Sequence, residues 1–117
     1  MTNNKNINYC IYARAQLHNP KSLLKQVKEL TIKAKKEQLN VVEIYGELGS
    51  GADTKRPLLN SMLKNITKNK IDGILCTGIH TITRNFKLME KINYLFRDKK
   101  LSVITTSDSN FYNNNLN

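Results

Sequence analysis

The segment INYCIYARAQLHNP, residues 7–20, changes from a strand pattern to a helix start over a short distance. Residues 7–13 are apolar and rich in β-forming types, so they predict a strand. Asn19 is a residue type that caps helices, and proline suits the first helical position, so a helix is predicted to begin at Pro20. The segment therefore predicts a strand that leads directly into a helix, as in α/β proteins.

The rest of the chain repeats this alternation. Apolar side chains at helical spacing predict helices, and short β-branched or apolar runs predict strands. The predicted helices are 20–38, 57–67 and 88–96, and the predicted strands are 7–13, 41–45, 71–77 and 101–106. Residues 46–57 and 78–85 predict loops, the first because it is rich in glycine and turn formers. This order predicts a three-layer α/β/α sandwich with a mainly parallel central sheet and flavodoxin-like topology.

Length and composition limit the class of protein. A chain of 117 residues has room for one domain with a real core. It shows no signal-peptide pattern and no apolar run long enough for a bilayer, so a cytoplasmic protein without a membrane partner is expected. Cys10 and Cys76 lie in predicted strands, and His18 and His80 lack the spacing of a ligand cluster, so neither a metal site nor a cofactor is expected.

The charge balance indicates a class of partner. Lysine and arginine number 19 against 9 aspartate and glutamate, which gives a net charge of +10. Such an excess favours polyanions, and the backbone of DNA or RNA is the usual one. The alternative is that most of these charges are lysines on solvated helix faces. Charge alone therefore leaves both interpretations open.

Polar residues follow each predicted strand, at the edge where parallel α/β sheets bind ligands. The side chains of Arg14, Lys55, Arg56 and Arg84 are expected to converge there. GELGSG, residues 46–51, resembles a phosphate loop, but the required Lys-Ser/Thr pair does not follow it. No G-x-G-x-x-G fingerprint follows the first strand either. Nucleotide-triphosphate and dinucleotide sites are therefore not predicted.

Several motifs together resemble the catalytic domain of the serine recombinases, the resolvase and invertase family. They are Y-x-R at 12–14, Gln26, E-x-x-S-G at 47–51, R-P at 56–57, Asp72, and T-R-N at 83–85. The resemblance runs from about residue 7 to residue 106. It implies a domain that cleaves DNA phosphodiesters through a covalent phosphoserine link, with arginines on the scissile phosphate. The matching positions expected to bind DNA phosphate are Arg14, Ser50, Arg56 and Arg84.

The departures from the family pattern lie at the positions that the resemblance assigns to the cleavage reaction. The family's serine nucleophile falls on Gln16, whose carboxamide has no ionisable hydroxyl. The family's D-R-x-x-R reads His80, Thr81 and Arg84 here, so an acidic residue and an arginine are replaced. We therefore expect a recombinase catalytic domain, associated with DNA recombination, that does not cleave DNA.

Two alternatives stay open for the function. The chain is either a regulatory protein that pairs with an intact recombinase, or an active recombinase that uses another hydroxyl. The hydroxyls near the predicted site are those of Tyr12, Ser22, Ser50 and Thr81, but the first strand is expected to place residue 16, and not Ser22, at the point of attack. Binding of a small ligand at the strand ends, as in flavodoxin-like proteins, is a more distant alternative.

The extent of the chain sets a further expectation. Members of the family continue into a long dimerisation helix and a small DNA-reading domain. Here residues 1–106 are expected to form the catalytic domain, and the Asn-rich residues 107–117 a disordered tail, with those two later parts absent. DNA binding is then expected to be weak, directed to the backbone and strongly salt-dependent. A homodimer, or a heteromer with an intact recombinase, is the other expected assembly.

Overall fold

The computed structural model describes residues 7–49 and 56–106 of the chain. The strands are β1 (Asn8–Ala15), β2 (Asn40–Leu48), β3 (Gly73–Cys76) and β4 (Ser102–Thr105). The helices are α1 (Pro20–Lys36), α2 (Pro57–Thr67), α3 (Ile79–Ile82) and α4 (Phe86–Asp98). The described residues thus follow the predicted order of strands and helices, except that two helices, α3 and α4, lie between β3 and β4.

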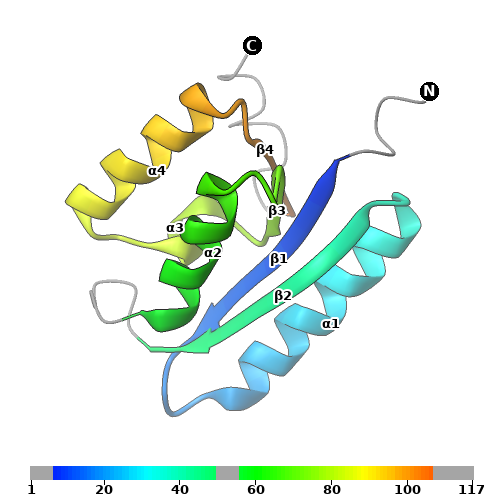
Figure 1. Cartoon of the computed structure of the whole chain (residues 1–117). Coiled ribbons are helices and arrows are strands. Elements are labelled where there is room, and N and C mark those ends of the chain that lie inside the picture. The colour runs from blue at the N-terminus through cyan, green and yellow to red at the C-terminus, as the bar shows by residue number, and fades with distance from the viewer. Residues whose placement is uncertain (1–6, 50–55, 107–117) are drawn as a thin grey trace.

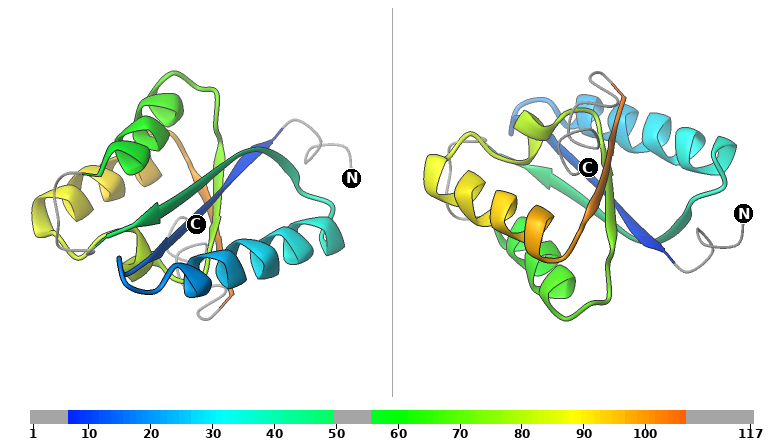
Figure 2. Two further views of the ribbon diagram at one scale, coloured as in Figure 1. Left: turned by 90° about the horizontal axis from the view of Figure 1, so that it is seen from below. Right: turned by 90° about the horizontal axis from the view of Figure 1, so that it is seen from above.

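The strands form one parallel sheet in the order β2-β1-β3-β4. Helix α1 lies on one face of this sheet, and α2 and α4 lie on the other (Figures 1 and 2). This arrangement confirms the predicted α/β/α sandwich with a parallel central sheet. Because all strands run the same way, their carboxyl ends meet at one edge, where α1 begins after β1.

Two apolar clusters hold the layers together. The larger one joins the buried side of α2 and α4 to one face of the sheet and includes Tyr12, Met62 and Phe96. The smaller one joins α1 to the opposite face through Leu30 and Ala34. Both clusters pack against β1, the strand in the middle of the fold, which explains why nearly all of its side chains are buried.

Helix α1 begins where the sequence predicts. The Asn19 side chain accepts a hydrogen bond from the Ser22 amide, and Pro20 occupies the first turn, where no amide donor is needed. The helix ends at Lys36, and Gln38 adopts a left-handed conformation with φ of 58°. The predicted end at about residue 38 was therefore slightly late.

Several boundaries at the functional edge differ from the prediction, among them the end of β1, which lies at Ala15 and not at residue 13. Strand β2 continues through Gly46 to Leu48, although these residues were expected to start a loop. They pair with residues 13–15 of β1, and this backbone pairing outweighs the weak strand preference of glycine. A short helix, α3, also occupies residues 79–82 of the expected loop 78–85.

Some of the predictions concern residues outside the described part of the chain. The predicted disorder of residues 107–117 lies outside the described residues, as do Ser50 and Lys55. Among the helices in the described part of the chain, none is both long and apolar enough to cross a membrane.

Candidate functional site

A polar pocket lies at the carboxyl end of β1, beside the start of α1. Its volume is about 410 Å³. The lining residues are Arg14, Ala15, Gln16, Asn19, Ser22, Gln26 and Arg84. The pocket thus brings two arginines from distant parts of the sequence together with several amide and hydroxyl groups.

Arg14 is held in a defined orientation in this pocket. Its Nε donates to the carbonyl of Thr81 at 2.8 Å, and its Nη1 donates to the carbonyl of Gly49 at 2.8 Å. Partial burial lowers the pKa of Arg14, and the positive charges of Arg56 and Arg84 lower it further. An anion at this position would relieve the repulsion between these charges.

Gln16 is the first residue after β1, and its exposed side chain lines the pocket. A carboxamide can donate and accept hydrogen bonds, but it is not a nucleophile for phosphorus. Ser22 lines the same pocket, in agreement with its predicted place near the site, although it was not expected at the point of attack. The amide of Gln26 joins these elements, because its Nε2 donates to the Arg14 carbonyl at 2.9 Å and lies 3.4 Å from the Ser22 hydroxyl.

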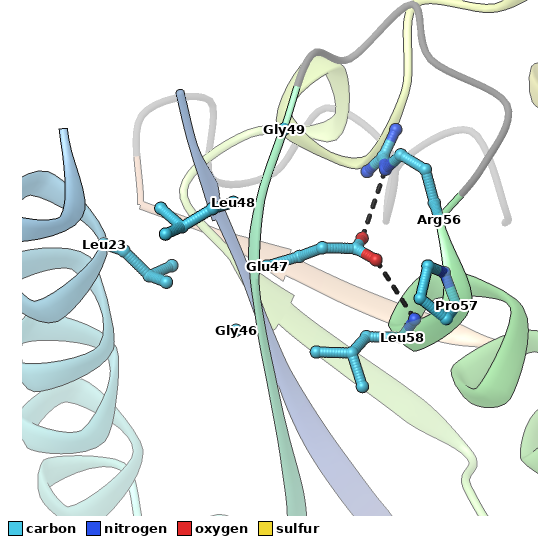
Figure 3. A pocket seen from close by; sticks show the side chains of 8 residues that line it. All are labelled: Leu23, Gly46, Glu47, Leu48, Gly49, Arg56, Pro57 and Leu58. Carbon is cyan, nitrogen blue, oxygen red and sulfur yellow. Dashed lines mark hydrogen bonds and ion pairs between the residues drawn. The ribbon is translucent and has the colours of Figure 1, made fainter. Parts of the chain in front are cut away.

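A buried ion pair between Glu47 and Arg56 lies next to this edge (Figure 3). The Nε of Arg56 donates to Oε1 of Glu47 at 3.1 Å, and the Tyr12 hydroxyl donates to the same oxygen at 2.7 Å. Nη2 of Arg56 donates to the Tyr12 hydroxyl and to the carbonyl of Ile82. Burial and the hydrogen bond to Glu47 raise the pKa of Tyr12.

The other oxygen of Glu47 binds the start of α2. Oε2 accepts from the backbone amide of Leu58 at 3.0 Å, in the first turn of that helix (Figure 3). The residue at the N-cap, Arg56, makes no capping hydrogen bond with its side chain, so the carboxylate of Glu47 takes that role from β2. A negative charge at a helix N-terminus is also favoured by the helix dipole.

The predicted phosphate-binding residues are therefore not all in one place. Arg14 and Arg84 share the polar pocket. Arg56 does not line it and is only 2% exposed. Thr81 contributes its backbone carbonyl, which accepts a hydrogen bond from Arg14. The His80 side chain and Ser50 lie outside what the structure describes.

Glu47 is the functional-edge residue that sequence reasoning did not assign. It was noted only as part of E-x-x-S-G, and its partners come from three separate segments. The sequence contains one signal for this ion pair: an acidic residue at position 47 and an arginine at position 56, near the two ends of the predicted loop 46–57. That signal does not say whether the two side chains meet in water or in the core.

The two cysteines and the histidines do not form a ligand set in the described residues. No group of three or more His, Cys, Asp or Glu side chains that could hold a metal ion occurs there. Both cysteines are free and buried, and burial raises the pKa of Cys76 to about 12 and that of Cys10 further. Thiols in this state are poor nucleophiles at neutral pH.

Comparison with known proteins gives one family. The model of the resolvase N-terminal domain matches residues 9–116. No curated protein sequence matches the chain significantly.

Solved structures of several recombinases share the fold. The C-terminal catalytic domain of ISC1926 TnpA, an IS607-like serine recombinase, is 27% identical with a TM-score of 0.74, covering 86% of this chain and 67% of that one. The N-terminal catalytic domain of TP901-1 integrase is 22% identical with a TM-score of 0.74, covering 87% and 78%. A resolvase family site-specific recombinase from Streptococcus pneumoniae is 20% identical with a TM-score of 0.71, covering 88% and 74%.

The family match spans most of the chain, and the parallel sheet topology is that of an α/β domain like the solved recombinase domains. This chain belongs to the resolvase family, as a protein with the N-terminal catalytic domain of the serine recombinases.

Proposed function

We propose that this chain is a DNA-binding recombinase-type domain of the cytoplasm that holds backbone phosphates without cleaving them. One observation carries the proposal: Arg14 and Arg84 line the same polar pocket as Gln16, which occupies the nucleophile position of the family. The pocket thus has groups that bind a phosphate, and a carboxamide stands where the family has its attacking serine.

Phosphate binding follows from the chemistry of the pocket. Guanidinium groups match phosphate oxygens in geometry and stay charged at every physiological pH. Arg14 uses Nε and Nη1 for backbone carbonyls, which fixes the plane of its guanidinium. The net charge of +10 adds long-range attraction for DNA and favours weak binding that does not depend on sequence.

The absence of cleavage follows from three positions. Gln16 supplies no hydroxyl for a phosphoserine link, so the covalent route has no starting atom. His80 and Thr81 occupy the positions of the family's acidic residue and one arginine. Removing one preorganised stabiliser of transition-state charge costs about 3 kcal/mol, so restoring serine alone would leave the site impaired.

DNA binding is expected to be measurable at low salt and to fall steeply as salt rises. Replacing Arg14 or Arg84 with glutamine is expected to reduce the slope of log affinity against log salt by about 0.9, the value for one lost phosphate contact. The matched control is Arg97→Gln, an exposed arginine in the last turn of α4. Fluorescence anisotropy with a short duplex between about 50 and 200 mM salt, where log affinity falls linearly with log salt, measures these slopes. Equal slopes for all three variants would contradict a phosphate site in the pocket.

An assay with the wild-type protein tests the proposed absence of DNA cleavage. Incubation with supercoiled plasmid DNA is expected to give neither nicked DNA nor a covalent protein–DNA species. Ser22 is the hydroxyl to check, because it lines the pocket with Gln16. Nicking that disappears in Ser22→Ala would overturn the proposal and show a relocated nucleophile.

A second candidate function is pairing with an intact serine recombinase, and the exposed edge strand of the sheet favours it. Strand β2 is an edge strand among the described strands, and its exposed apolar side chains include Val42, Ile44 and Leu48. Exposed apolar edge strands are places where another chain can add to a sheet. If pairing is the function, a mixed complex with an intact resolvase-family recombinase will persist at high salt, whereas a contact bridged by DNA will dissociate.

A further inference from the structure

Helix α3 is held at its end by two arginines from other parts of the fold. The carbonyl of Thr81 accepts from Nε of Arg14 at 2.8 Å. The next carbonyl, that of Ile82, accepts from Nη2 of Arg56. A helix of this length has little stability of its own, so these tertiary contacts decide where it lies.

Arg56 is committed to internal partners. Its guanidinium donates to Glu47, to Tyr12 and to the carbonyl of Ile82, and the residue is 2% exposed. A phosphate at this buried guanidinium would compete with the carboxylate for it. Glu47 would then remain a buried charge without its cation, which is strongly unfavourable.

Glu47 extends the same network to α2, through the amide of Leu58. The set of Tyr12, Glu47 and Arg56, here called the buried triad, therefore ties together β1, β2, the start of α2 and the end of α3. Arg84 follows α3 by two residues and precedes Asn85, whose side chain caps α4. The position of Arg84 thus depends on where α3 is held.

We propose that Arg56 is a positioning residue of this domain and not a phosphate ligand. Through the buried triad it fixes α3, and thereby places Arg84 in the same pocket as Arg14. This inference rests on the proposed DNA binding for its functional consequence. Its structural part, that Arg56 holds the end of α3 in place and so acts as a tether, does not depend on DNA binding.

The salt dependence of DNA binding separates the two roles of an arginine. Arg56→Gln and Arg56→Lys are both expected to lower the affinity for DNA at low salt. A loss of about tenfold is expected, the lower end of the effects found when residues that orient metal ligands are replaced. The slope against salt is expected to stay at the wild-type value, because the bound state keeps its phosphate contacts and only the fraction of free protein with Arg84 in place falls. Arg84→Gln, in contrast, is expected to reduce it by about 0.9.

Lysine distinguishes the two roles as well. It keeps the positive charge but lacks the planar fork that contacts Glu47, Tyr12 and Ile82 at the same time. Recovery of wild-type affinity in Arg56→Lys, or a slope reduced in Arg56→Gln as in Arg84→Gln, would overturn the proposal. Tyr12→Phe is the milder variant, because it removes one partner and keeps the ion pair and the ring.

Hydrogen exchange tests the tether without DNA. Amides of residues 79–85 and of the first turn of α2 are expected to exchange faster in Arg56→Gln and Tyr12→Phe, while those of α1 keep their wild-type rates. Unchanged exchange at 79–85 in both variants would refute the tether. If the wild-type protein fails to bind DNA, the proposed function fails, whereas the exchange data still decide the role of Arg56.

Discussion

Replacing Glu47 with alanine is expected to lower the free energy of unfolding by about 3–5 kcal/mol, the range for breaking a buried ion pair. The change leaves the guanidinium of Arg56, the hydroxyl of Tyr12 and the amide of Leu58 without their acceptor. The side chains of Arg56 and Glu47 are 1% and 7% exposed, so water cannot replace the lost carboxylate without opening the fold. Urea unfolding followed by circular dichroism measures the difference.

The chain contains a matched control for this measurement. Glu37 pairs with Lys33 at 2.6 Å on the surface of α1, with side chains 41% and 28% exposed. Glu37→Ala is expected to cost only about 0.3–0.5 kcal/mol, as for other exposed helix pairs. Similar losses in the two variants would refute the view that burial makes the Glu47 pair important. The double variant Glu47→Ala/Arg56→Met is expected to be more stable than Glu47→Ala, because it also removes the buried positive charge that Glu47 had balanced.

The second large effect is expected at Gly73, where Gly73→Ala should lower the free energy of unfolding by about 1–3 kcal/mol, the usual cost of overpacking. A Cβ at this position would lie 2.4 Å from the ring of Tyr9, on the neighbouring strand β1. The ring is buried, and its hydroxyl hydrogen-bonds to Ser102 at 3.1 Å, so it cannot move aside freely.

Gly46→Ala is the control for this substitution in the same sheet. Its Cβ would meet the side chain of Leu23 at 3.6 Å, an ordinary contact, so no loss of stability is expected. The double variant Tyr9→Ala/Gly73→Ala is expected to cost less than the sum of its parts, because the clash requires the ring. Additive losses in urea unfolding would show that Gly73 is needed for another reason.

The buried triad gives the family motifs a use that is separate from DNA cleavage. Tyr12, Glu47 and Arg56 come from Y-x-R, E-x-x-S-G and R-P, and all three are buried in contact with one another. A chain without the serine nucleophile still needs these residues to place α2 and α3. The presence of these motifs is therefore no evidence that the reaction takes place.

Much of the fold could be predicted because it follows from local patterns. Asn19 and Pro20 mark a helix start through the needs of the first amides, whatever surrounds them. The apolar periods of α1, α2 and α4 and the short strands between them predict the alternation that forms a parallel sheet. The strand ends carrying Arg14 and Gln16 follow from the same pattern, since that edge collects the polar residues.

The sequence by itself thus predicted the α/β order and the edge that carries the pocket, and it has Gln16 where the family pattern has its serine. Only the tertiary structure decided that Arg56 is buried against Glu47, that Ser22 lines the pocket and that β2 continues to Leu48. The physical reason is that local patterns report which backbone conformation a segment prefers. The surroundings of a charged side chain depend instead on partners distant in sequence, and such partners bury Arg56 in the core while Arg14 and Arg84 line the pocket.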